Sequence, residues 1–136
     1  MDDDKPGMLV FEEKKAVRHP ANERECVVVV NRVQGTDGKI SVKYKTVPLG
    51  QGDQQAKPGI DYEPVEGELE FLHQESKKAI TIKILAHEDP DEERDEIFGL
   101  KLYDAEPNVV KISKKDTAVI EIVTDAEKKK QAEALT

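Results

Sequence analysis

Apolar and polar residues alternate along most of the chain, which is typical of strands that bury one face and expose the other. The clearest case is Lys78 to Leu85, where isoleucine occupies every second position from Ile80 to Ile84. Strands are predicted for seven segments: Met8 to Val17, Glu25 to Val33, Lys39 to Val47, Gly67 to Leu72, Lys78 to Leu85, Asp95 to Tyr103 and Thr117 to Val123. About seven short strands without interleaved helices favour an all-β antiparallel sandwich with Greek-key connections.

The connections carry their own signals. Gly35 to Gly38 joins the second and third predicted strands and has the composition of a hairpin turn. The polar segment Pro48 to Lys57 is predicted to be a long mobile loop, because it is rich in Gln and Gly and bounded by prolines. Met1 to Lys5 looks like a protease-site or cloning remnant. We therefore predict a domain over residues 8–124, with a remnant at 1–7 and a polar tail or linker at 125–136.

Length and charge narrow the classes of protein. A chain of 136 residues fits a single domain with one core. The formal net charge is -8, so the overall field repels nucleic acid and anionic lipid. Cys26 is the single cysteine and sits in an apolar run, which predicts a buried thiol and a reducing compartment. No stretch approaches the roughly 20 apolar residues that a membrane-spanning helix needs.

The most unusual local feature is an acidic run over residues 88–96, which has seven carboxylates in nine residues between two predicted strands. Calcium takes 6 to 8 oxygen ligands and would relieve the repulsion within such a run. A solvated acidic loop without metal is the competing interpretation. The candidate calcium ligands are Glu88, Asp89, Asp91, Glu92 and Glu93.

Catalytic patterns are not apparent, and we expect neither an enzyme nor a bound organic cofactor. His19, His73 and His87 fall in different predicted connections, and none belongs to a nucleophile elbow or a zinc-binding helix motif. Gly50-Gln51-Gly52 lacks the strand-to-helix context of a phosphate-binding loop. The three histidines are therefore predicted to be exposed loop residues.

Two segments carry a family resemblance. Gly59-Ile60-Asp61-Tyr62, followed by Gly67-Glu68-Leu69-Glu70-Phe71, resembles the Calx-β pattern of Gly-x-Asp-Tyr/Phe, then Gly, then a strand ending in Phe. The similarity extends over about Met8 to Thr124 and is greatest to the second of two tandem Calx-β domains in sodium/calcium exchangers. The resemblance implies an immunoglobulin-like sandwich in a cytosolic regulatory loop, on the cytoplasmic side of the plasma membrane. It implies two partners: a neighbouring Calx-β domain and the transmembrane antiporter portion of the parent protein.

The resemblance also implies where calcium ligands would lie, and several positions depart from the pattern. An acid is expected after the first strand, where the chain reads Arg18-His19-Pro20-Ala21. Another is expected after the third strand, where Asp53 is the nearest substitute. Paired aspartates are expected at Ala86-His87, with Glu88 third, so the surviving acids are Asp91, Glu92 and Glu93. Losing carboxylates removes both ligands and charge, so we expect no bound calcium.

The resulting hypothesis is a non-catalytic module that relays the calcium state of a neighbouring Calx-β domain to the antiporter. Two alternatives stay open. The first is a calcium sensor that uses the acidic run 88–96. The second is a Calx-β module of an adhesion or scaffold protein, which the resemblance also allows.

Overall fold

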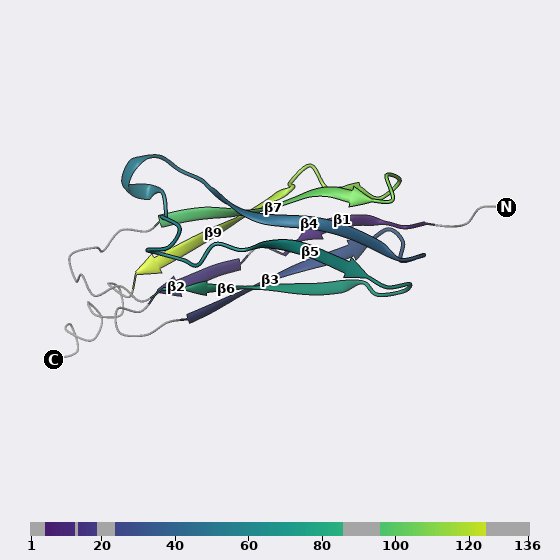
Figure 1. Cartoon of the computed structure of the whole chain (residues 1–136), viewed down its shortest axis with the longest axis horizontal. Helices are drawn as coiled ribbons and strands as arrows, with labels where there is room; N and C mark the ends of the chain where they lie inside the picture. Colours follow the sequence, from purple (N-terminus) through teal and green to yellow (C-terminus); the bar gives the residue numbers. More distant parts are fainter. Residues whose placement is uncertain (1–4, 13, 19–23, 86–95, 125–136) are drawn as a thin grey trace.

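Two β-sheets pack face to face in the computed structural model, which describes residues 5–12, 14–18, 24–85 and 96–124 (Figure 1). The four-stranded sheet has the order β6 (Lys77–Ile84), β3 (Arg24–Val33), β1 (Met8–Phe11) and β8 (Lys111–Ile112). The five-stranded sheet has the order β2 (Lys14–Arg18), β9 (Thr117–Thr124), β7 (Glu96–Glu106), β4 (Ile40–Pro48) and β5 (Glu66–Phe71). The predicted all-β sandwich is confirmed.

The core lies between the sheets and follows the alternation read from the sequence. In β6, Ile80, Ile82 and Ile84 are buried, whereas the residues between them are exposed. The same spacing buries the inward side of the other long strands. The largest fully buried side chains are Tyr62, Phe71, Phe98, Leu9, Ile40, Ile82, Ile84, Leu100, Leu102, Ile120, Ile122 and Val28. Cys26 is buried, as predicted.

The single strand predicted over Met8 to Val17 is divided between the two sheets. β1 pairs antiparallel with β3 in one sheet, while β2 pairs with β9 in the other. The central pairs are antiparallel as expected, but β1–β8 and β2–β9 are parallel. Both halves carry a strand pattern, and alternation alone does not show that the chain changes sheet between them.

The hairpin predicted at Gly35 to Gly38 is wrong, because the strands it joins lie in different sheets. β3 pairs with β1 and β6, whereas β4 pairs with β5 and β7. Gly35 has φ 152°, and a Cβ atom there would overlap the carbonyl oxygen of Lys5. Glycine is thus required by the close approach of another segment, which a hairpin interpretation does not anticipate.

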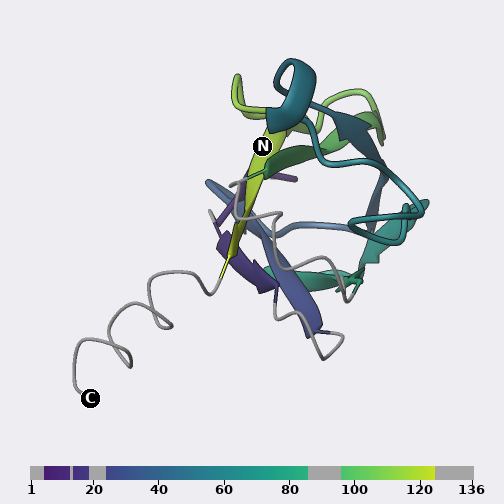
Figure 2. The same cartoon turned by 90° about the vertical axis from the view of Figure 1, so that its left-hand side faces the viewer.

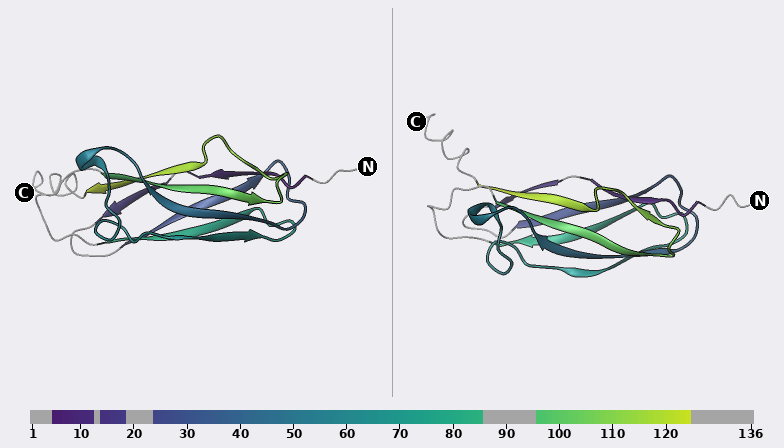
Figure 3. Two further views of the ribbon diagram at one scale, coloured as in Figure 1. Left: turned by 45° about the horizontal axis from the view of Figure 1, so that its top comes forward. Right: turned by 90° about the horizontal axis from the view of Figure 1, so that it is seen from above.

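The sandwich has two distinct ends, which Figures 1 and 3 show from the side, whereas Figure 2 looks along the molecule from one end. At the N-terminal end, the segment before β1 meets the β3–β4 and β5–β6 connections. At the opposite end, which we call the loop end, β2, β6 and β9 finish and β3 and β7 begin. Among the described residues, no helix has the length and apolar character needed to cross a membrane.

Candidate functional site

The loop end is the candidate functional site because it gathers the connections that the sequence singled out. Strand register places the last residues of β2 and β9 opposite each other, with Arg18 paired to Thr124. Arg24 at the start of β3 pairs with Ile84 at the end of β6. Glu96, which begins β7, pairs with Ile122 of β9. The last residues of β2 and β6 therefore lie at the same end of the molecule, although the two strands are far apart in the sequence.

The five calcium candidates Glu88, Asp89, Asp91, Glu92 and Glu93 all lie outside the described residues. The same holds for the segments 19–21 and 86–87, where the resemblance led us to expect acids. Asp53 belongs to the short 3-10 helix η1 (Gly52–Gln54). Within the ranges 5–12, 14–18, 24–85 and 96–124, no cluster of three or more His, Cys, Asp or Glu side chains could hold a metal ion. The calcium-site candidates stay predictions.

A tight turn over residues 57–62 lies at the loop end, next to the last residues of β6. Asp61 is only 3% exposed, and its Oδ2 atom accepts a hydrogen bond of 2.8 Å from the Lys57 amide. The Asp61 amide donates back to the Lys57 carbonyl at 2.9 Å. Gly59 has φ +84°, the left-handed region that glycine enters without strain. The Gly-x-Asp part of the sequence motif is therefore a turn-forming unit.

Tyr62, the last residue of that motif, anchors the turn in the core. Its ring stacks on Phe98 with centroids 3.8 Å apart and planes 6° from parallel. Burial raises the pKa of the Tyr62 hydroxyl, and the nearby Asp61 charge raises that pKa further. The Asp61 carbonyl accepts a 3.0 Å hydrogen bond from the Leu85 amide, three residues before the acidic run begins at Glu88. The turn thus holds Leu85, the last described residue of that segment.

The segment predicted to be a long mobile loop, Pro48 to Lys57, is packed against the start of β7. It contains η1, and Ala56 has no exposed surface. The Ala56 amide donates to the Ile97 carbonyl at 2.9 Å. The polar composition of the segment did not predict this contact, because the contact is made by the backbone of Ala56 and not by a series of apolar side chains.

Sequence reasoning missed Arg32, which organises the N-terminal end. The residue is 3% exposed, and its guanidinium donates to five backbone carbonyls. The acceptors are Pro6 (2.7 Å), Leu72 (3.2 Å), Glu75 (3.4 Å), Asp37 (2.6 Å) and Gly38 (2.8 Å). Burial lowers the pKa of Arg32, and the charge of Asp37 opposes that shift. The sequence did indicate this burial, because Arg32 falls on the same alternate positions of β3 as the buried residues Cys26, Val28 and Val30.

Further hydrogen bonds tie the N-terminal segment to the same end. The Lys5 amide donates to Asp37 Oδ2 at 2.8 Å, and the Asp37 amide donates to the Lys5 carbonyl at 3.0 Å. His73 Nδ1 accepts from the Gly38 amide at 2.8 Å, and the residue is exposed as predicted. Residues 5–7 were placed before the predicted domain boundary, yet they contact the sandwich. The N-terminal end is a connected set of three segments held around one guanidinium.

Comparisons with known proteins agree with this architecture. The family model described as Calx-beta domain matches residues 2–127. Sodium/calcium exchanger 1 of Canis lupus familiaris is 33% identical over 120 residues, or 88% of this chain, and the rat protein (Rattus norvegicus) is 32% identical over the same length. The match spans 11% of the length of these relatives.

Solved structures show the same fold. A crystal structure of the Calx CBD2 domain matches with a TM-score of 0.74 at 20% identity, covering 99% of this chain and 98% of that one. The apo form of the Calx CBD1 domain matches with a TM-score of 0.69 at 24% identity, covering 87% and 96%. CBD12 from CALX1.2 matches with a TM-score of 0.71 at 24% identity, covering 87% of this chain and 45% of that one. With the family model spanning nearly all of the sandwich, the chain belongs to the Calx-beta domain family.

Proposed function

We propose that this chain is a non-catalytic regulatory domain of a sodium/calcium exchanger. It relays the calcium state of a neighbouring Calx-beta domain to the transmembrane antiporter, on the cytoplasmic side of the plasma membrane, and binds no calcium itself. Membership of the family and the exchanger relatives support this role. The match to part of a longer CBD12 chain supports a neighbouring domain in the same protein.

The observation that carries the proposal is the fastening of the N-terminal segment by Arg32. One guanidinium joins Pro6 to the β3–β4 connection at Asp37 and to the β5–β6 connection at Leu72. A displacement of the chain before β1 cannot leave those connections unchanged, because the same buried donor group serves all three. A preceding domain would therefore be coupled to the body of this one.

The residue types at the loop end support the part of the proposal that excludes calcium. β2 ends at Arg18, where the family pattern has an acid. The Asp61 carboxylate is already hydrogen-bonded to the Lys57 amide, which holds the turn. A calcium ion needs 6 to 8 oxygen ligands, so a site here would depend mainly on the acidic run itself.

Calcium titration by calorimetry and by thermal melting tests this part. We expect no binding heat at micromolar calcium and an unchanged melting temperature, since a ligand that binds only the folded state must raise stability. The triple variant D91N/E92Q/E93Q should then behave as the wild type. The matched control E66Q/E68Q/E70Q removes equal charge from exposed positions on β5. Micromolar binding that D91N/E92Q/E93Q alone abolishes would contradict the proposal.

The relay is tested in the parent exchanger by substituting Arg32. R32M should weaken the regulation of transport by cytosolic calcium while transport itself persists, because the coupling group is lost but the antiporter is untouched. K43M is a matched control, since Lys43 is exposed and, among the described residues, forms an ion pair with Asp104 alone, at 3.9 Å. Unchanged calcium regulation in R32M, with the variant protein folded, would reject the relay.

The second candidate function is a calcium sensor, and the acidic run favours it. Seven carboxylates fall within residues 88–96, and the last of them, Glu96, begins β7 at the loop end with 6% exposure. Hard cations prefer such oxygen donors. The same titration decides between the two functions, because the sensor requires a rise in melting temperature that D91N/E92Q/E93Q removes.

A further inference from the structure

Two strand edges on one side of the sandwich have no partner strand among the described residues. β5 is the last strand of the five-stranded sheet, and β6 is the last strand of the four-stranded sheet. The chain passes directly from β5 into β6 through the connection 72–76, and the two strands touch, so both edges belong to the same side of the molecule (Figure 1). Unpaired backbone groups at a sheet edge are a template for another strand.

The outward backbone groups of β5 can be identified from the pairing with β4. The Val65 carbonyl, one residue before β5, accepts a 2.9 Å hydrogen bond from the Thr46 amide of β4. Successive residues of a paired strand point their amide and carbonyl groups to opposite sides, so every second residue after Val65 points toward β4. The residues between them point their backbone groups to the open side. These residues are Glu66, Glu68 and Glu70.

The edge of β6 is open over its first half. The Ser76 carbonyl, one residue before β6, accepts a 2.8 Å hydrogen bond from the Arg32 amide of β3. The same alternation turns the odd-numbered residues of β6 outward. In agreement, the Lys83 carbonyl accepts from the Glu63 amide, which covers the second half of the edge. The open outward residues are Lys77, Ala79 and Thr81.

The two edges carry opposite charges. The outward residues of β5 are all exposed glutamates. Among the described residues, Glu70 pairs with Lys39 at 3.5 Å, but Glu66 and Glu68 have no ion pair. Lys77 begins the β6 edge, is exposed, and likewise has no ion pair within the described part of the chain. A β5 edge is therefore repelled by another β5 edge and attracted by a β6 edge.

We infer that a second copy of this chain binds to this side of the sandwich, with β5 of each copy adding to β6 of the other. A two-fold axis parallel to the strands produces both junctions. β5 ends at the N-terminal end and β6 starts there, and rotation about this axis keeps strand direction, so each junction is antiparallel. The four-stranded sheet of each copy then continues into the five-stranded sheet of the other. The inference goes beyond the regulatory role and does not depend on whether the chain binds calcium.

The rotation also brings the complementary charges together. The glutamates of β5 and Lys77 of β6 all lie on the outer faces of their sheets, because the alternate residues, such as Phe71 and Ile80, face the core. Outer faces remain outer faces under this rotation. Glutamates of one copy and the lysine of the other therefore lie on the same face of the joined sheet, and the symmetry repeats this pairing at the second junction.

Apolar side chains beside the edges add to the contact, although the interface is small. Tyr44 and Leu69 are partly exposed on this side, and Leu72, directly after β5, is 52% exposed. Three edge residues per strand make a weak dimer, so we expect a Kd on the order of 0.1 mM. Each copy has a net charge of -8. At physiological salt the Debye length of about 8 Å screens this long-range repulsion more than it screens contacts at the edge.

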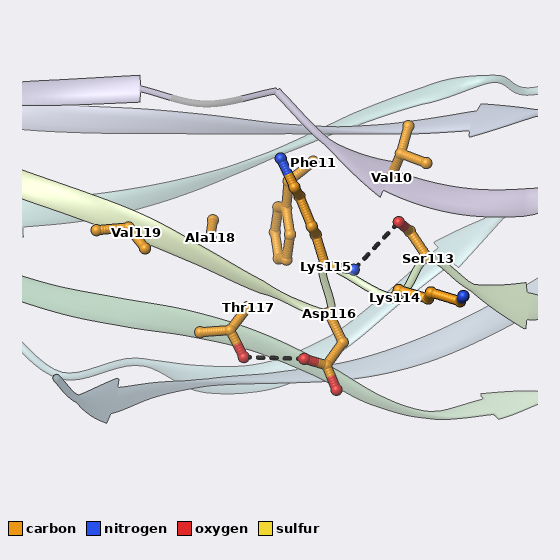
Figure 4. Close-up of a pocket in the computed structure, with 9 residues that line it drawn as sticks. All are labelled: Val10, Phe11, Ser113, Lys114, Lys115, Asp116, Thr117, Ala118 and Val119. Carbon is orange, nitrogen blue, oxygen red and sulfur yellow. Dashed lines mark hydrogen bonds between the residues drawn. The ribbon is translucent and has the colours of Figure 1, made fainter.

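The opposite side of the sandwich lacks this complementarity. Its outermost strands are β2 and β8, and β8 is only two residues long. A groove of about 740 Å³ lies between β1 and β9, formed by Val10, Phe11 and residues 113–119 (Figure 4). Lys114 and Lys115 are exposed at this groove, and both β2 and β8 contain basic residues and no acid. Strands of like charge do not attract each other, so a second copy is better accommodated at β5 and β6.

Sedimentation equilibrium of the full chain in about 0.15 M salt tests the inference. We expect a monomer–dimer equilibrium, and amide chemical shifts of residues 66–70 and 77–81 should change as the protein is concentrated. A79P should abolish the dimer and leave the monomer folded. Proline removes an amide that points to the open side, so no hydrogen bond to β3 is lost.

Charge-reversal variants separate this arrangement from other contacts. E66K/E68K makes both edges basic, and K77E/T81E makes both edges acidic. Neither variant should dimerise alone, and we expect each Kd to rise about tenfold or more, because like charges then meet at both junctions. An equimolar mixture of the two variants should form a heterodimer. In that mixture the basic β5 meets an acidic β6 at one junction, and an acidic β5 meets a basic β6 at the other.

The control K114E/K115E reverses two exposed lysines on the opposite side and should dimerise as the wild type. A chain that stays monomeric at millimolar concentration would overturn the inference. Failure of the two charge-reversed variants to associate with each other would also overturn it. Stronger dimerisation of E66Q/E68Q than of the wild type would show that β5 pairs with β5, and equal dimerisation of A79P would place the contact away from the edges.

Discussion

The N-terminal end and the loop end of the sandwich are held by opposite kinds of interaction. At the N-terminal end, a buried cation donates hydrogen bonds to five backbone carbonyls from three segments. At the loop end, the ring of Tyr62 stacks on that of Phe98. The turn before Tyr62 is closed by the Asp61 carboxylate, which accepts a hydrogen bond from the Lys57 amide. The first joins distant segments to one another, whereas the second fastens a local turn to the core.

The difference bears on the two proposed functions, because each would rely on a different end of the sandwich. At the N-terminal end, one guanidinium shares its hydrogen bonds among the segment before β1 and two connections, which is the arrangement that the proposed relay uses. The turn at the loop end is held by local contacts, and it hydrogen-bonds Leu85, the last described residue before the acidic run. A relay domain needs the first property, and a sensor domain needs the second.

We expect the largest loss of stability when the Phe98 ring is removed from its stack with Tyr62 at the loop end. F98A should lower the free energy of unfolding by about 4 kcal/mol, because Phe98 is fully buried and its loss leaves a cavity beside Tyr62. F98L retains most of the volume and should cost about 1 kcal/mol. Urea denaturation measures both. Equal stabilities for F98A and F98L would show that the stack does not hold this end.

Removing the guanidinium at the N-terminal end should come next. R32M should lower the free energy of unfolding by about 3 kcal/mol, because it leaves several carbonyl acceptors without a donor. Hydrogen exchange should rise at residues 36–38 and 72–76 but not at 57–62, and F98L should show the reverse. A uniform rise in either variant would mean that the two ends are not independent.

Alkaline pH should weaken the loop end selectively. The folded-state pKa of Tyr62 is raised above its ordinary value of 10.0, so the folded protein holds that proton longer than the unfolded chain. This contribution to stability is complete below pH 10 and is lost as the pH rises through the folded-state pKa. Urea midpoints measured from pH 8 to 11 should fall more for the wild type than for Y62F. Parallel curves would exclude Tyr62 as the group responsible.

Acid should act on the N-terminal end, with the smallest effect. Glu75 accepts a hydrogen bond from the Leu72 amide at 2.7 Å and lies 3.2 Å from Lys78 Nζ. These contacts hold the Glu75 pKa below its ordinary value of 4.5. The resulting stability is present above that value and is lost as the pH falls through the lowered pKa. The urea midpoint of E75Q should therefore change less between pH 5 and 3 than that of the wild type. E68Q serves as the exposed control.

The strands were predictable from the sequence because only one face of each sheet is buried, so apolar and polar side chains alternate along a strand. Ile80 to Ile84 and Ala118 to Ile122 were placed correctly for that reason. The role of Asp61 and Tyr62 was predictable only as a motif, since the contact of Tyr62 with Phe98 joins positions far apart in the chain. The burial of Arg32 was also predictable, because this charged residue stands at a core-facing position of its strand.

The sequence by itself determined the fold class, the inward faces of the strands and the unusual acidity of residues 88–96, because these depend on local composition and periodicity. Only the tertiary structure decided which strands are partners. It separated β1 from β2, turned an expected hairpin into a connection between sheets, and brought Pro6, Asp37 and Leu72 around Arg32. Strand pairing and buried hydrogen bonds satisfy backbone groups that every residue shares, so side-chain patterns do not specify their partners.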